Sequence, residues 1–235
     1  MANLILYELG GLDDRRYSQF SWRTRMALAH KGFAFETVPV RVSDKTAISF
    51  SNQDKVPILK DGERVVIDSW KIAEYLEDTY PERASLFGGK TGRGLARFVN
   101  AFVDRVLIPK LVPLVMLDVL AIVDAPDGAH LRSGIEKAFR KTLEEMAAQR
   151  EAGLTDFRGA LDPVRATLRA QSFLCGDAPA YADYILFSLF QWARIVSSVD
   201  VLAPDDAIVP WRERMLDLFG GLARSQAARS LEAAA

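Results

Sequence analysis

Residues 55–81 read KVPILKDGERVVIDSWKIAEYLEDTYP, and this stretch decides the fold. Two strand-like runs meet at Asp61-Gly62, a dipeptide that favours a tight hairpin. They lead directly into a helical pattern in which Ile72, Tyr75 and Leu76 share one face, and Pro81 ends that helix. The stretch therefore predicts a ββα unit.

The sequence on the amino-terminal side supplies the other half of the same domain. LILYEL (residues 4–9) and FETVPV (residues 35–40) are compact apolar runs separated by a helical pattern. A strand, a helix and a strand in this order predict a parallel pair with a right-handed crossover. The first eighty or so residues are thus expected to form an α/β domain of order βαβ-ββα.

On the carboxyl side, almost everything after residue 90 carries only the helical period. We expect a domain over residues 1–84, a linker over 85–92 and an all-helical domain over 93–235. The helical windows are 92–122, 130–152, 156–171, 181–198 and 205–219. The linker contains GGKTGRG (residues 88–94), which departs from the P-loop pattern, so we expect a flexible linker in which Thr91 caps the next helix.

The composition removes several classes of function. Thirty basic and thirty-one acidic residues leave a net charge of -1, which gives no overall attraction to nucleic acid or to an anionic membrane. Cys175 is the only cysteine, and His30 and His130 are the only histidines. We therefore expect no disulfide, no metal site and no histidine-based triad, and we expect a cytoplasmic protein without a membrane span.

The first helix begins close to two serines. Trp22, Met26 and Phe33 belong to one apolar stripe, so the helix must start near residues 18–21, where Ser18 and Ser21 are both good N-caps. A serine in this place can cap the helix and still donate its hydroxyl proton to an anion. Because no cysteine lies near this helix, any thiol activated there must come from a ligand.

The energies involved are compatible with thiol activation. Thiols at helix N-termini have pKa values of about 3.5 to 7.5, against about 8.5 for a free cysteine. A drop of two units requires ~2.7 kcal/mol. One charge-assisted hydrogen bond contributes about 1.5 to 3 kcal/mol, and the helix end adds about 0.3 to 1 kcal/mol.

Two more short motifs lie near the hairpin. If the Val56-Pro57 bond is cis, the turn exposes the backbone of Val56 to an extended peptide ligand. Asp68 and Ser69 open the helix that follows the hairpin, and they suit either an N-cap or a site for a ligand carboxylate and ammonium.

Taken together, the serine at the first helix, the VP turn and the DS pair resemble those of the glutathione transferases. The resemblance covers nearly the whole chain and implies a thioredoxin-like domain followed by an all-helical domain. SQFSWRTRMALAHKGF (residues 18–33) is similar to the serine-type zeta and bacterial β-etherase branches. Gln19 departs from that pattern, as does Ala180, which leaves Asp177 or the backbone alone to cap the helix near Asp183.

The resemblance also implies roles for individual residues. Ser18 donates to the glutathione sulfur, with Ser21 as the alternative, while Val56 and Pro57 align the cysteinyl backbone. Asp68 and Ser69 hold the γ-glutamyl end. The candidates for binding the glycyl carboxylate are Lys45, Gln53 and Lys55. The candidates for the walls of the electrophile pocket are Tyr17, Phe98, Phe102, Val106 and Val115.

Three functions remain open at this point. The first is attack of activated glutathione on an apolar or aromatic electrophile, by conjugation or by reductive ether cleavage, with Arg15 and Arg16 attracting an anionic or phenolic substrate. The second is a zeta-like isomerisation or dehalogenation, and the third is a binding or regulatory protein without catalysis. The resemblance also implies a homodimer.

Overall fold

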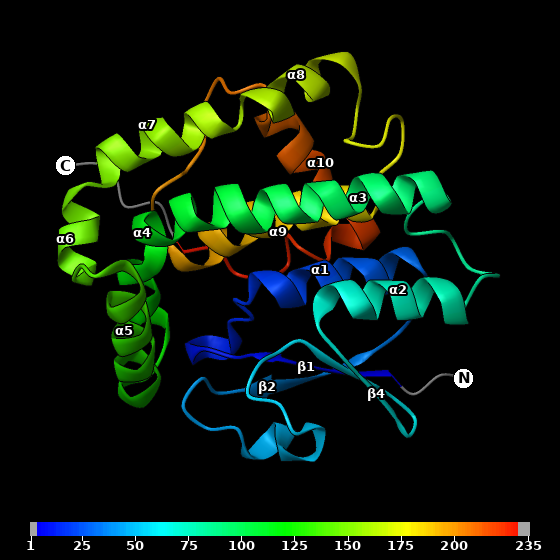
Figure 1. Cartoon of the computed structure of the whole chain (residues 1–235), viewed down its shortest axis with the longest axis horizontal. Helices are drawn as coiled ribbons and strands as arrows, with labels where there is room; N and C mark the ends of the chain where they lie inside the picture. The colour runs from blue at the N-terminus through cyan, green and yellow to red at the C-terminus, as the bar shows by residue number, and fades with distance from the viewer. Residues whose placement is uncertain (1–3, 230–235) are drawn as a thin grey trace.

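The computed structural model describes residues 4–229 and places a four-stranded sheet beneath a layer of helices (Figure 1). The strand order is β2-β1-β3-β4. β1 (Leu4–Leu9) pairs in parallel with β2 (Glu36–Val40), and β3 (Ile58–Asp61) pairs antiparallel with both β1 and β4 (Arg64–Ile67). The expected βαβ-ββα order is confirmed.

Two helices of this domain lie between the sheet and the helical domain (Figure 1). α1 spans Gln19–His30 and α2 spans Ser69–Thr79. Trp22 and Met26 of α1 are fully buried, as the apolar stripe predicts. Short turns of helix cover Leu12–Asp14 (η1) and Thr46–Ser51 (η2).

The helical domain begins with one long rod. α3 (Lys90–Phe102), the π-helical η3 (Val103–Leu107) and α4 (Ile108–Val119) follow one another without a break, and η4 (Leu120–Ile122) completes the expected window. The prediction that Thr91 caps this rod is wrong, because Gly89 occupies the N-cap and Thr91 lies inside the helix. Gly89 has a φ of 104°, which favours glycine at that position.

In place of the two helices expected over residues 130–152 and 156–171, the chain forms four shorter helices, α5 to α8. The remaining helices of the domain are α5 (Ala125–Phe139), α6 (Leu143–Ala148), α7 (Arg150–Ala160), α8 (Asp162–Ala170), α9 (Tyr181–Val196) and α10 (Val209–Gly221). Arg140 ends α5 in a left-handed conformation, and Thr142 then starts α6 with a reciprocal capping box to Glu145. The helical period alone predicts one helix over residues 130–152, but these local caps divide it into shorter helices.

α9 forms the centre of the core and packs against α1, α3 and α4. Its start is held by Asp183, whose carboxylate accepts hydrogen bonds from the backbone N–H groups of Ala180 at 3.1 Å and Leu174 at 2.7 Å and from Trp211 Nε1 at 2.9 Å. The expectation that Asp177 or the backbone alone caps this helix is therefore wrong. The side chain of Asp183 binds the backbone N–H of Ala180, the N-cap residue. No helix within residues 4–229 is long and apolar enough to cross a membrane.

Candidate functional site

The amino-terminal end of α1 carries the two serines. Ser18 is the N-cap, and its Oγ accepts a hydrogen bond from the Ser21 N–H at 3.2 Å. The hydroxyl of Ser18 keeps its proton for donation, and 7% of the residue is exposed. Ser21 is 0% exposed, and its Oγ has no hydrogen-bond partner within the described residues. Ser18 thus keeps a small exposed surface and Ser21 has none, but neither serine lines the cleft beside Pro57, whose lining residue from α1 is Phe20.

A cleft of about 390 Å³ opens beside the cis peptide bond between Val56 and Pro57. Its lining residues are Phe20, Gln53, Lys55, Val56, Pro57, Ile67, Asp68 and Ser69. Six of the seven residues expected to bind glutathione thus come together there. The seventh, Lys45, lies in a neighbouring hollow that shares Gln53 with this cleft.

The side chain of Lys45 makes a hydrogen bond within the fold. Its Nζ donates to the backbone oxygen of Arg41 at 3.3 Å, and burial lowers the pKa of the ammonium group. Gln53 and Lys55 instead border the cleft directly. The structure therefore brings these two candidates for the glycyl carboxylate to the cleft and leaves Lys45 outside it.

The polar groups of the cleft are only partly used by the fold. Asp68 is the N-cap of α2, and its Oδ1 accepts from the Trp70 N–H at 3.0 Å and the Lys71 N–H at 3.1 Å, which leaves Oδ2 for a cation. Neither the N–H nor the C=O of Val56 makes a hydrogen bond with the described part of the chain. An extended peptide backbone can pair with such a free edge as an added strand.

Phe20 and Ile67 are the two lining residues that the sequence did not single out, and Phe20 is the aromatic one. It follows Ser18 on α1 but lies off the buried stripe, so its ring borders the cleft. The guanidinium of Arg23 sits 4.8 Å from the ring centre and is fixed by Asp104 at 2.7 Å, on α3's continuation into η3. The sequence could have indicated this role, because Phe20 is an aromatic residue at the helix start that lies outside the buried apolar stripe.

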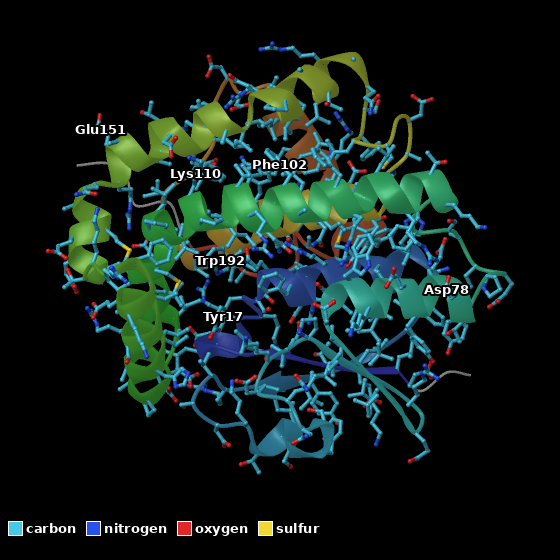
Figure 2. All side chains as sticks on the ribbon, in the orientation of Figure 1. Tyr17, Asp78, Phe102, Lys110, Glu151 and Trp192 are labelled. Carbon is cyan, nitrogen blue, oxygen red and sulfur yellow. The ribbon has the colours of Figure 1, made fainter. Side chains whose placement is uncertain are left out.

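The residues expected to form the electrophile pocket do not come together. Tyr17, labelled in Figure 2, lies just before α1 and is 3% exposed. Val115 is 0% exposed, so both residues belong to the core. Phe98 is 71% exposed on α3, while Phe102 and Val106 are partly exposed farther along the same rod. Helical period cannot distinguish these environments, because the neighbours of each face are set by the tertiary fold.

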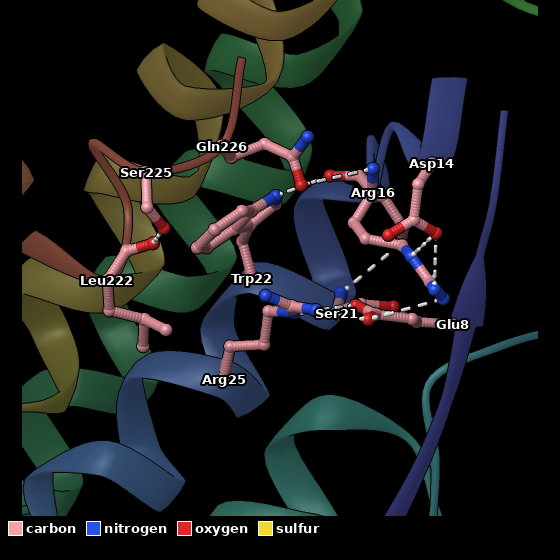
Figure 3. Close-up of polar contacts among 10 residues, drawn as sticks. Glu8, Asp14, Arg16, Ser21, Trp22, Arg25, Leu222, Ser225 and Gln226 are labelled. Atoms are coloured by element: carbon pink, nitrogen blue, oxygen red, sulfur yellow. Dashed lines mark hydrogen bonds and ion pairs between the residues drawn. The ribbon is translucent and has the colours of Figure 1, made fainter. Parts of the chain in front are cut away.

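Arg15 and Arg16, the two arginines before Ser18, both make contacts within the fold, and Figure 3 shows those of Arg16. The Arg16 N–H donates to Oε1 of Gln226 at 3.3 Å, and the Arg16 carbonyl accepts from Trp22 Nε1 at 2.7 Å. Arg15 Nη1 donates to the backbone oxygen of Ile195 at 3.3 Å. The Arg15 side chain and the Arg16 backbone therefore hold the loop to the helical domain, whereas the Arg16 guanidinium binds Asp14 and lies near Glu8 within the first domain.

No group of three or more residues that could hold a metal ion occurs within residues 4–229. The buried hydroxyl of Tyr17 has no hydrogen-bond partner in the described part of the chain, and burial together with the nearby Asp127 carboxylate raises its pKa. The phenol therefore stays protonated near neutral pH. The ionisable side chains that line the cleft are those of Lys55 and Asp68.

Comparison with known families is consistent along the chain. Residues 12–84 match the model described as the N-terminal domain of glutathione S-transferase, and residues 94–206 match the model of its C-terminal domain. Over 203 residues the chain is 24% identical to glutathione S-transferase omega-1 of Mus musculus, a match that covers 85% of this chain and 73% of that protein. Over 94 residues it is 34% identical to maleylacetoacetate isomerase of Pseudomonas aeruginosa, which covers 37% of this chain and 44% of that one.

Solved structures show the same architecture. Glutathione transferase GSTFuA3 from Phanerochaete chrysosporium superposes with a TM-score of 0.75 at 24% identity, over 93% of this chain and 92% of that one. CsGST63524 of Ceriporiopsis subvermispora, solved in complex with glutathione, superposes with a TM-score of 0.73 at 22% identity, over 95% of this chain and 94% of that one. At these identities the two structures establish the fold.

Proposed function

Because the chain belongs to the glutathione S-transferase family, we propose that the cleft beside Pro57 binds glutathione and that Ser18 activates its thiol. The observation that carries this proposal is the set of groups around one cleft. The free backbone edge of Val56 suits the cysteinyl unit, and Asp68 suits the γ-glutamyl ammonium. Gln53 and Lys55 border the same cleft and suit the glycyl carboxylate.

Ser18 stands at the helix end that favours an anion. Its Oγ accepts from the Ser21 N–H, so its proton is directed to a second partner, and a thiolate is an acceptor of that kind. The N-terminus of α1 adds a favourable field for the negative charge. Together these two contributions match the ~2.7 kcal/mol that a two-unit drop in thiol pKa requires.

The activated sulfur then attacks an apolar or aromatic electrophile. A carbon–sulfur bond forms, and the bond to the leaving group breaks with its electron pair on that group. In an aryl ether the leaving group is a phenolate, which takes a proton from solvent. Phe20 supplies an aromatic edge beside the cleft for such a substrate. We assign the protein to the serine-type, β-etherase-like branch on the basis of the Ser18-to-Phe33 motif, and to the cytoplasm because its single cysteine suits a reducing compartment.

A zeta-like isomerisation or dehalogenation is the second candidate, favoured by the partial match to maleylacetoacetate isomerase. It uses the same thiolate, so product analysis with maleylacetoacetate-type and aryl ether substrates distinguishes the two. A glutathione-binding protein without catalysis is the third candidate. In that case glutathione binds, but no electrophile is turned over.

We also propose a homodimer through α2 and α3. A hollow of about 1110 Å³ lies between these helices, with Glu74 and Asp78 on the α2 side and Arg93 and Arg97 on the α3 side. Asp78 already pairs with Arg93 within the chain, which leaves Glu74 of one copy to face Arg97 of another across a twofold axis. Phe98, 71% exposed on α3, supplies apolar surface for the contact.

The test of the catalytic assignment is a matched pair of serine variants. Ser18→Ala should raise the pKa of bound glutathione by about one to two units, since the hydrogen bond it removes is worth about 1.5 to 3 kcal/mol. Ser21→Ala, at the buried hydroxyl, should leave that pKa unchanged. The pKa is read from the ultraviolet absorbance of the thiolate against pH. An unchanged pKa in Ser18→Ala, with glutathione still bound by calorimetry, contradicts the role of Ser18.

A further inference from the structure

A second cavity, of about 200 Å³, lies at the carboxyl end of α9. The segment 197–201, the start of α10 and the returning residues 224–229 close it on the other sides. None of its lining residues borders the cleft beside Pro57. Its buried apolar wall consists of Phe190, Ala193, Val201 and Leu216.

The remaining walls are strongly cationic. The charged lining residues are Asp200, Glu213, Arg194, Arg212, Arg224 and Arg229. Both carboxylates already have arginine partners, because Asp200 pairs with Arg212 at 2.7 Å and Glu213 pairs with Arg224 at 3.0 Å. Four arginines against two carboxylates leave an excess of two positive charges among the lining residues, and Asp217, outside the lining, pairs with Arg224 as well.

The excess resides on Arg194 and Arg229. Arg194 Nη1 donates to the backbone oxygen of Gln226 at 2.8 Å, and Arg229 Nη1 donates to that of Asp118 at 2.9 Å. Among residues 4–229 the hydrogen bonds of both guanidinium groups go to backbone oxygens, which are neutral, and neither group pairs with a carboxylate. Burial, and then the nearby Arg224 cation, lower the pKa of Arg194, while the Glu213 carboxylate acts in the opposite direction.

We propose that this cavity binds a small carboxylate that carries one apolar ring. A carboxylate accepts paired hydrogen bonds from a guanidinium group, and it neutralises the excess charge of Arg194 and Arg229. The ring covers the apolar wall at Phe190 and Leu216, which an inorganic anion would leave in contact with water. A volume of about 200 Å³ limits the occupant to a single ring with a short acidic arm.

Calorimetry with benzoate, benzyl alcohol and inorganic phosphate tests both halves of this proposal. We expect benzoate to bind, and we expect benzyl alcohol, which lacks the charge, and phosphate, which lacks the ring, to bind at least tenfold more weakly. Arg194→Gln should weaken benzoate binding at least tenfold, whereas Arg169→Gln, at an exposed arginine on α8, should leave it unchanged. Equal binding of benzoate and either of the other two probes overturns the proposed ligand class.

Arg194→Gln also removes the hydrogen bonds from Arg194 to the backbone of residues 223–226, so a second variant is needed that keeps them. Val199 lies half-buried at the cavity, and Val199→Phe fills the space while keeping every charge. This variant should abolish benzoate binding and keep the glutathione affinity of the unsubstituted protein. If benzoate fails to bind the unsubstituted protein at millimolar concentration, or binds Val199→Phe normally, the cavity is not its site.

Discussion

Nδ1 of His30 lies 2.5 Å from the hydroxyl of Tyr184, while its Nε2 lies 3.0 Å from the backbone oxygen of Ser85. A carbonyl oxygen can only accept, so Nε2 carries the proton and Nδ1 accepts the hydrogen bond of the tyrosine. The contact joins α1 of the first domain to α9 of the second and to the connection between them. It exists in this form only while the imidazole is neutral.

Stability is therefore expected to fall in mild acid. Burial lowers the pKa of His30, and the hydrogen bond to the Ser85 carbonyl opposes this effect; the smaller effects of the Lys31 cation and the Glu77 carboxylate lower and raise the pKa respectively. The unfolded chain then binds a proton more readily than the folded one, so this contribution is complete above about pH 6.5 and is lost as the pH falls from there through the folded pKa. Urea unfolding at pH 7.5 and 5.5 measures it. His30→Gln should lessen the loss of stability between the two pH values, whereas His130→Gln, at an exposed histidine, should leave it unaltered.

Asp68 has two separable duties. Asn is as good an N-cap as Asp, so Asp68→Asn should keep the melting temperature while it raises the KM for glutathione about tenfold or more, because the negative charge near the ammonium is gone. Asp68→Ala should raise KM similarly and also cost about 1 kcal/mol of stability through loss of the cap. Steady-state kinetics and thermal unfolding separate the two effects. Equal KM values for Asp68→Asn and the unsubstituted enzyme would argue against the ammonium contact.

Gly11 is fixed by a close approach between the domains. A Cβ added there would lie 2.4 Å from the backbone oxygen of Ile122. Gly11→Ala should therefore destabilise the protein by about 1–3 kcal/mol, the usual cost of overpacking. Gly134→Ala, on α5 with no atom within 4 Å of the added Cβ, should instead stabilise it by up to about 1 kcal/mol through helix propensity. Chemical denaturation of both variants checks the contrast.

The dimer proposal predicts a change of molecular mass. Phe98→Glu places a charge on the exposed apolar surface of α3 that is proposed to join the contact, and it should shift the protein to monomers in sedimentation velocity experiments. Val65→Glu introduces the same charge at another exposed apolar position, on β4, and should leave the mass unchanged. A monomeric parent protein, or a dimer unaffected by Phe98→Glu, removes this interface.

The sequence predicted best those features that depend on near neighbours in the chain. Leu4–Leu9 forms the expected strand, the Asp61-Gly62 hairpin forms, and Ser18 caps α1, because pleat, turn and cap are all set within a few residues. Val56, Pro57, Asp68 and Ser69 lie close in sequence around the same hairpin, so their meeting in one cleft also followed.

Features that depend on packing between domains did not follow from the sequence. Val115 and Phe98 share an apolar character and a helical period, yet one is fully buried and the other is 71% exposed, since only the position of α9 and of the first domain decides which face is covered. The same reason accounts for Arg16, whose role depends on Gln226, 210 residues farther along the chain. No periodicity encodes a partner at that separation.

The hydrogen bond from Arg16 to Gln226 has a consequence for biosynthesis. The loop that leads to Ser18 acquires this partner only after residue 226 has left the ribosome. A nascent chain that has folded its sheet still lacks this contact. The loop is thereby completed by the helical domain rather than when its own domain emerges.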